Sequence, residues 1–300
     1  MTPTLHTLEN DFWQVGILPE TGASVAFGRV RKDDAWVDVL RPTDPADYDN
    51  ASKCASFILI PWSNRIRDAK FTFEGTEYPL EVNNSEGTAS HGDTRKRPWQ
   101  VESAGRERIN LSFNSTAHNN LNFPFPFAAT AEYWLDGHDF LMCLSLRNIG
   151  DQPMPGGMGH HPYFVRTDDV MLELPLDEAY EMVDSLPTGA AVPIPEHLDF
   201  RTLRKLSDAP PLNDLLRGRQ SEKPMRIVYP DLSIGITADS LYEHVVVYSP
   251  EGQPHFAVEP VTNANDGFNL YARGIPGSGV FVLAPGEEKD GMIRVKYEVN

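Results

Sequence analysis

The sequence predicts an all-β fold, a large β-sandwich formed by one domain over residues 1–300. Many short runs alternate apolar and polar residues with a period of two, which is typical of strands with one buried face. The 25 prolines fall mainly between these runs, as expected of turns and loops. Hydrophobic residues make up 40% of the 300 residues and charged residues 23%, so the chain can bury a sizeable core.

The runs can be followed along the chain. Residues 71–78 are expected to form a short hairpin. Residues 133–135 and 140–147 flank Asp136-Gly137, a pair typical of a type I′ turn, in which both central residues need φ > 0. Residues 293–299 end the chain as a strand with one buried and one exposed face. Further alternating runs cover residues 109–113, 232–237 and 245–248.

Helical patterns are scarce. Residues 213–217 and 46–53 are each expected to make about one helical turn. No repeat, low-complexity tract or linker divides the sequence, which favours a single domain.

The charge balance argues against whole classes of partner. Acidic residues number 43 and basic residues 26, which gives a formal net charge of −17. Such a surface repels polyphosphate and anionic lipid, so we expect neither nucleic-acid nor membrane binding. The first thirty residues contain no long apolar run, and the two cysteines cannot form a disulfide framework. These features predict a cytoplasmic protein.

Two polar motifs follow apolar or loop segments in the first third of the chain. Arg65 lies just after the apolar run 57–60, where it either lines a cleft or forms a salt bridge at the sheet edge. His91 precedes Gly92, and a glycine allows the backbone to approach a ligand closely. Taken alone, each residue is more typical of a structural role.

Two further motifs lie near later strand ends. His160 and His161 follow three glycines, and on a strand they would point to opposite faces, so only one could enter a given pocket. Glu259 lies on the face of an apolar strand shared by His255 and Ala257. A carboxylate among apolar residues must be paired or functional, because burying an unpaired charge is costly. A purely structural Glu–Arg pair is the alternative.

Together, a glutamate, histidines and an arginine near strand ends suit proton transfer on a polar small molecule. The sequence contains no GxGxxG, GxxxxGK[ST] or GxSxG motif, and the adjacent histidines lack metal-ligand spacing. We therefore expect no cofactor and no metal.

Taken in chain order, these motifs resemble one family, the aldose 1-epimerases or galactose mutarotases. The resemblance rests on Asn64-Arg65-Ile66 with residues 69–75, on His91-Gly92, on His161-Pro162-Tyr163-Phe164, and on Glu259-Pro260-Val261-Thr262. It extends from about residue 10 to the C-terminus. It implies the galactose mutarotase-like supersandwich fold, in agreement with the strand pattern.

The resemblance also implies an isomerase that interconverts the α and β anomers of an aldose. It makes Glu259 the general base on the anomeric hydroxyl and His161 the general acid on the ring oxygen. It further implies that His91 and Arg65 bind the sugar. Asp214 is the best match to a family aspartate that binds sugar hydroxyls.

Several alternatives stay open. A branch of the family acts on hexose 6-phosphates and holds the phosphate with arginine; Arg95 could do so here, although the run 95–97 is more typical of a solvated surface. A non-catalytic carbohydrate-binding sandwich is a further alternative, and a glycosidase would need a second carboxylate. Asp93 and Asn263 stand where many family members have glycine and histidine, which leaves the sugar undetermined.

Overall fold

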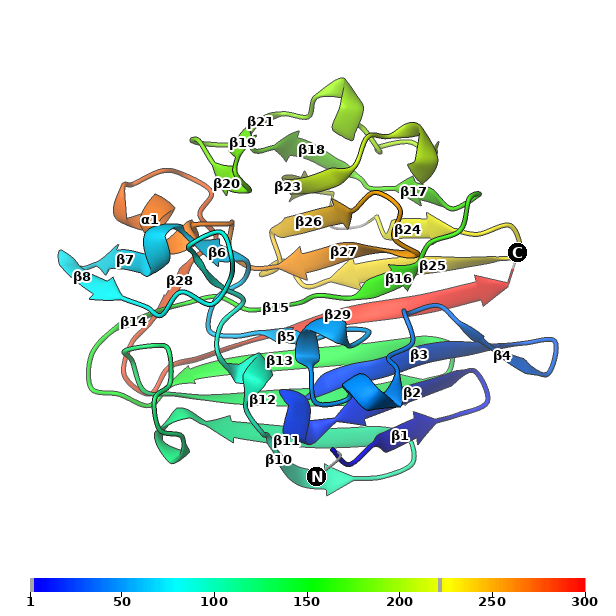
Figure 1. Cartoon of the computed structure of the whole chain (residues 1–300), viewed down its shortest axis with the longest axis horizontal. Helices are drawn as coiled ribbons and strands as arrows, with labels where there is room; N and C mark the ends of the chain where they lie inside the picture. The colour runs from blue at the N-terminus through cyan, green and yellow to red at the C-terminus, as the bar shows by residue number, and fades with distance from the viewer. Residues whose placement is uncertain (1–2, 221–222, 300) are drawn as a thin grey trace.

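The fold consists of stacked antiparallel sheets, as the alternating sequence pattern predicts. A computed structural model describes residues 3–220 and 223–299. Two large sheets of nine and eight strands form the main layers, and a four-stranded sheet from the N-terminal segment packs beside them (Figure 1). The β-sandwich expectation is confirmed.

The nine-stranded sheet contains the longest strands, and β29 crosses it between β13 and β25. Its order is β10 (Gln100–Ala104), β11 (Arg108–Asn114), β12 (Phe127–Asp136), β13 (Asp139–Asn148), β29 (Glu288–Val299), β25 (Leu232–Ala238), β24 (Met225–Val228), β17 (Met171–Glu173) and β22 (Arg204–Lys205). The four-stranded sheet has the order β1 (His6–Glu9), β2 (Trp13–Leu18), β3 (Ser24–Lys32) and β4 (Ala35–Asp38).

The eight-stranded sheet carries most of the candidate site residues. It comprises β21 (Val192–Pro193), β18 (Leu176–Ala179), β23 (Leu212–Arg219), β26 (His244–Ser249), β27 (His255–Val261), β15 (Gly159–His160) and β5 (Ile58–Leu59), with β16 (Tyr163–Val165) also paired to β27. Four small ribbons surround it: β6 (Arg65–Ile66) with β9 (Ala89–Ser90), β7 (Lys70–Phe73) with β8 (Thr76–Pro79), β14 (Met154–Gly156) with β28 (Phe281–Leu283), and β19 (Met182–Val183) with β20 (Leu186–Pro187).

The hairpin predictions hold, with one change of turn. The hairpin β7–β8 turns at Glu74-Gly75, and both residues have positive φ. In the β12–β13 hairpin, Asp136 pairs with Asp139, so the central residues are Gly137 and His138 rather than Asp136 and Gly137. Of these two, Gly137 alone has positive φ, which fits a type II′ turn with glycine first.

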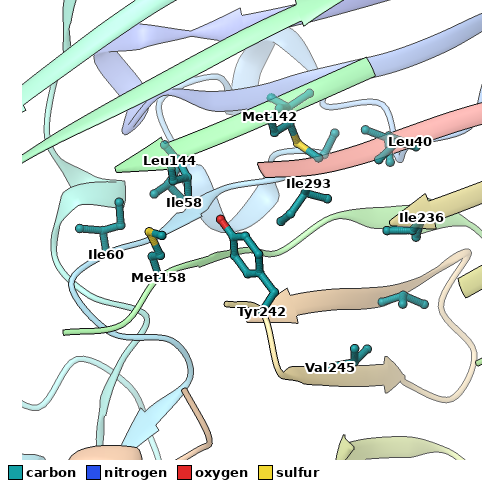
Figure 2. Packing of buried hydrophobic residues seen from close by; sticks show 14 of the residues in the cluster. Leu40, Ile58, Ile60, Met142, Leu144, Met158, Ile236, Tyr242, Val245 and Ile293 are labelled. Carbon is teal, nitrogen blue, oxygen red and sulfur yellow. The ribbon is translucent and has the colours of Figure 1, made fainter. Parts of the chain in front are cut away.

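The main core lies between the large sheets. In Figure 2, Tyr242 lies among apolar side chains of β13, β29, β5 and β26, and its hydroxyl donates a hydrogen bond to the Gly291 carbonyl at 3.1 Å. Tyr242 is fully buried, so this bond satisfies its polar atom. The core fixes the distance between the sheets and leaves the other face of the eight-stranded sheet free to carry a site.

The expected helices differ from those observed. Residues 213–217 belong to strand β23, because pairing with β26 and β18 outweighs the helical spacing of the leucines. Residues 46–53 contain two 3₁₀ turns. The α-helix of the described residues is α1 (Gly267–Ala272), which sequence reasoning missed. The 3₁₀ turns are η1 (Pro19–Thr21), η2 (Pro45–Asp47), η3 (Ala51–Lys53), η4 (Arg67–Ala69), η5 (Thr94–Lys96), η6 (Ser115–Ala117), η7 (Glu196–Leu198) and η8 (Leu206–Asp208).

Candidate active site

A small polar cavity of about 180 Å³ lies on the face of the eight-stranded sheet. Residues from β6, β16, β23, β26, β27 and the segments next to β9 and β15 converge on it. They are Asn64, Arg65, His91, His161, Tyr163, Asn213, Val246, Tyr248 and Glu259. The cavity therefore brings together four of the five residues expected to act on a sugar.

Glu259 reaches the cavity because of strand alternation. On β27, Phe256 and Val258 point into the main core, whereas Glu259 faces the cavity beside its cross-strand partner Val246. The Glu259 side chain is almost fully buried. Its Oε1 lies 3.2 Å from Nε2 of His161, and its Oε2 has no protein hydrogen-bond partner. One carboxylate oxygen therefore has hydrogen-bonding capacity that the described residues do not use.

The two adjacent histidines point to opposite sides, as the strand argument predicts. His160 is fully buried against Tyr133, with 5.8 Å between ring centroids. His161 faces the cavity, and its ring packs between Phe57 and Tyr163 at 4.7 Å and 4.4 Å. This aromatic packing fixes the imidazole plane so that Nε2 points at Glu259.

Burial favours the uncharged form of both Glu259 and His161. It raises the pKa of the Glu259 carboxyl well above its usual range, and the positive charge of Arg65 opposes this. Burial also lowers the pKa of His161 to about 3, with further lowering from Arg41, Arg95 and Arg65. Burial thus disfavours the charged form of each partner, and the 3.2 Å contact lets a proton pass between Glu259 and His161.

Arg65 and His91 enter the cavity from neighbouring backbone segments, because β6 pairs with β9. Arg65 Nη1 donates a hydrogen bond to Asn64 Oδ1 at 3.0 Å. His91 has a φ of 62°, and its ring lies 5.5 Å from that of His161. The next residue, Gly92, also has positive φ, and a side chain there would collide with the Ile60 carbonyl. The glycine thus permits the close approach that delivers His91.

Asp214 is the predicted site residue that the structure does not bring into the cavity. Its neighbour Asn213 lines the cavity, and the side chains of adjacent strand residues point to opposite faces. Asp214 is half-buried, and its carboxylate accepts a hydrogen bond from the Asn213 amide at 3.0 Å. Burial raises the pKa of Asp214. Sequence reasoning missed Asn213 because it treated residues 213–217 as a helical turn.

Arg95 also differs from its expected setting. Arg95 is only 6% exposed, so its interpretation as part of a solvated charge run is wrong. Of its neighbours, Lys96 is exposed, and Arg97 forms an ion pair with Asp93 at 2.7 Å. Arg95 lies over the Phe57 ring and donates a hydrogen bond to Ser52 Oγ at 2.7 Å. Because Phe57 also packs against His161, Arg95 lies close to the acid–base pair without lining the cavity.

The described residues offer no candidate metal site. Within residues 3–220 and 223–299, no three or more His, Cys, Asp or Glu side chains are grouped as metal ligands would be. In the same part of the chain, no helix has the length and apolar character needed to cross a membrane.

The fold and the cavity define a β-sandwich protein with a carboxyl–imidazole pair in a small polar cavity. Residues 5–296 match the sequence profile of the aldose 1-epimerase family, and the chain belongs to this family. It is 28% identical to the uncharacterized protein YihR of Escherichia coli K12 over 223 residues, or 71% of each chain.

Solved structures share the fold. A candidate aldose 1-epimerase from Escherichia coli K12 superposes with a TM-score of 0.85 and 21% identity, covering 99% of both chains. A GalM/aldose epimerase homologue from C. elegans gives a TM-score of 0.84 and 18% identity, again over 99% of both chains. At these identities, the likeness establishes the architecture.

Proposed function

We propose that this protein interconverts the α and β anomers of an aldose. The observation that carries the proposal is the Glu259–His161 pair, with Oε1 and Nε2 at 3.2 Å, facing one cavity of sugar-compatible polarity. The anomeric oxygen O1 and the ring oxygen O5 are both bonded to C1, so one small cavity can present a base to the first and an acid to the second. Family membership supports the same chemistry.

In the proposed reaction, Glu259 accepts the proton of the anomeric hydroxyl. The freed electron pair forms the C1=O1 bond, the C1–O5 bond breaks, and O5 takes the proton of His161. The aldehyde then turns about the C1–C2 bond. Ring closure on the other face returns the O5 proton to His161 and the Glu259 proton to O1, so the pair ends as it began, with one proton.

Binding falls to the other side chains of the cavity. Arg65 and His91 are proposed to hold sugar oxygens, as the sequence motifs imply. The hydroxyl-binding role expected of Asp214 passes to Asn213, whose amide lies in the cavity and can both donate and accept. An amide there leaves Glu259 as the sole carboxyl group among the nine lining residues.

A second candidate substrate is an aldose that carries an anionic group, such as a 6-phosphate. Two guanidinium groups without acidic partners favour it. Arg41 lies 3.9 Å from the centroid of the Tyr163 ring, and Arg95 lies 5.3 Å from that of Phe57. Both rings pack against His161, so the two arginines lie close to the cavity without lining it. Both donate hydrogen bonds to Ser52, Arg41 to its carbonyl oxygen and Arg95 to its hydroxyl.

Within the described part of the chain, neither of these two cations has a carboxylate partner to offset its charge. Among the described residues, no carboxylate oxygen lies within 4.0 Å of either guanidinium, and both Nε atoms are buried without a hydrogen-bond partner. Uncompensated guanidinium groups are costly to bury, and an anion supplies both charge and acceptors. In a chain of net charge −17, such a local excess of positive charge favours an anionic ligand.

The test is anomer exchange measured by NMR over a panel of aldoses, each with and without a 6-phosphate. Exchange well above the buffer rate on any sugar supports the proposal. Sugar binding without exchange would instead identify a carbohydrate-binding sandwich and refute catalysis. If the anionic substrate is correct, Arg95→Ala should weaken use of the phosphorylated sugar by about tenfold or more. The matched control, Lys96→Ala, removes an exposed neighbouring charge and should change rates by less than about threefold.

A further inference from the structure

Glu86, an exposed glutamate outside the cavity, forms an ion pair with Arg65, which lines the cavity. Glu86 forms two parallel hydrogen bonds with Arg65, from Nε to Oε2 and from Nη2 to Oε1. The Arg65 side chain is 17% exposed and the Glu86 side chain 44% exposed, so the pair spans the cavity rim. We propose that Glu86 is a positioning residue, which acts on the substrate through Arg65. This inference rests on the proposed function.

The ion pair with Glu86 leaves some N–H groups of Arg65 available to a substrate. A guanidinium has five N–H groups. Two of them are used by Glu86 and a third by Asn64 Oδ1, which leaves one N–H on each terminal nitrogen. Because the fork is planar and rigid, fixing three donors also fixes the directions of the remaining two. Arg65 is thus prepared to donate to neighbouring ligand oxygens.

The loop that carries Glu86 is built to hold it there. Asn84 Oδ1 accepts hydrogen bonds from the amides of Glu86 and Thr88, at 3.0 Å and 3.2 Å. Asn83 Oδ1 accepts from the Ser90 amide at 2.8 Å, and Asn83 Nδ2 donates to the Ser90 carbonyl at 3.0 Å. Ser90 in turn pairs with Arg65 across β6 and β9. The same short segment therefore places Glu86 on Arg65 and His91 in the cavity.

Stability alone does not account for this arrangement. A surface ion pair of this exposure usually contributes less than about 1 kcal/mol to folding. The loop is polar, and the side chains of Asn83 and Asn84 bind backbone groups on both sides of Glu86 or close the loop around it. A role in directing Arg65 explains why a solvated loop is cross-linked at this point.

Glu86 also offsets the charge of Arg65 near the acid–base pair. The groups that face Glu259 from the surrounding elements are His161, His91, Tyr163, Tyr248 and Arg65. Arg41 and Arg95 lie further out and act on His161. Of these cations, Arg65 is the one that acts on Glu259, lowering its pKa. Removing the charge of Glu86 leaves Arg65 less compensated, so the acid limb of activity should move to lower pH.

The experiment compares Glu86→Gln, Arg65→Ala and the double variant by sugar binding and by anomer exchange over a pH series. Glu86→Gln should weaken binding or raise KM about tenfold, leave kcat within about threefold, and shift the acid limb downward. In the Arg65→Ala background, Glu86→Gln should add less than about twofold, because its effect passes through Arg65. Calorimetric binding keeps the test independent of turnover: if no sugar exchanges but binding still depends on Glu86, the proposed function fails and the positioning role stands.

The matched control is Glu173→Gln. Glu173 pairs with Arg226 at 2.9 Å on the nine-stranded sheet and should leave binding and pH dependence unchanged. Unchanged binding in Glu86→Gln, or additive losses in the double variant, would overturn the inference. So would an equal effect of the control.

Discussion

Glu259→Gln is the most direct test of the proposed chemistry. The amide keeps the size of the side chain and can still hydrogen bond to His161. It cannot take the proton of an anomeric hydroxyl. We therefore expect sugar binding to stay within about tenfold of wild type while turnover falls by about 10²-fold or more.

The structure sets the size of this loss. General acid–base groups contribute about 10²- to 10⁴-fold, or about 3–5 kcal/mol of transition-state stabilisation. Among the described residues, no second carboxyl group lines the cavity, and the nearby Glu86 is engaged by Arg65. Burial lowers the pKa of His91, the other histidine of the cavity, which makes it a weak base. The variant thus has no obvious replacement, and the upper part of the range is expected.

Folding provides an internal check on the same variant. Because the folded-state pKa of Glu259 is raised, its effect on stability is most favourable at acid pH and is lost as pH rises through that pKa. Glutamine does not titrate, so the variant should gain stability relative to wild type as the pH rises. Urea unfolding at pH 5 and pH 8 measures this difference.

The assay is NMR saturation transfer between the two anomers, with calorimetry for binding. The acid limb of the wild-type pH profile should be missing from the residual activity of the variant. Exchange near the wild-type rate in a folded Glu259→Gln protein would remove the carboxylate from the mechanism. It would also remove the main reason for assigning mutarotation.

Three further predictions concern the neighbouring residues His160 and His161 and the neighbouring residues Asn213 and Asp214. His161→Asn should lower turnover by about 10²-fold or more, whereas His160→Phe should stay within about threefold in the same anomer-exchange assay, since His160 faces the core; equal losses would contradict the strand argument. Asn213→Ala should weaken sugar binding about tenfold by calorimetry and Asp214→Ala less than about twofold, and the reverse order would restore Asp214 as the sugar ligand. Burial lowers the pKa of His160 from 6.5 to about 3, so the free energy of unfolding falls as the pH drops below 6.5. In urea titrations at pH 8 and pH 5, His160→Phe should lose about 2 kcal/mol of this pH dependence. An unchanged dependence would contradict the assignment.

Period-two patterns allowed much of the architecture to be predicted from the sequence. The same principle correctly separated His160 from His161, because a strand sends adjacent residues to opposite faces. Asp214 came from the family resemblance, and the helical interpretation of residues 213–217 left no strand face on which to check it. A shift of one residue exchanges the two faces of a strand, so Asn213 rather than Asp214 reaches the cavity.

The arginines show a different limit. Arg95 stands in a run of three basic residues, yet η5 turns it inward while its neighbour Lys96 stays exposed. A charge run gives no period from which to choose the buried member. Glu86 carries no signal at all, since its role depends on β6 and β9 coming together from segments that are separate in the sequence.

The residues that differ from the family pattern also have physical explanations. Asp93 binds Arg97 and accepts a hydrogen bond from the Asn122 amide at 3.2 Å, so it fastens the loop behind His91. Asn263 is buried and exchanges hydrogen bonds with Ser63, its Oδ1 accepting from the Ser63 amide at 3.0 Å. Both side chains support the backbone around the cavity rather than line it.

The charges around the acid–base pair connect catalysis with substrate choice. Burial is the main cause that lowers the pKa of His161, and Arg41, Arg95 and Arg65 lower it further, which opposes the protonated imidazole that the ring oxygen requires. An anionic group bound by Arg41 and Arg95 would cancel part of this positive potential. Such a substrate would then make His161 easier to protonate in the complex than in the empty cavity. The two arginines that favour an anionic aldose would thus also let that substrate promote the protonation of His161, the general acid. A neutral sugar cannot provide this coupling.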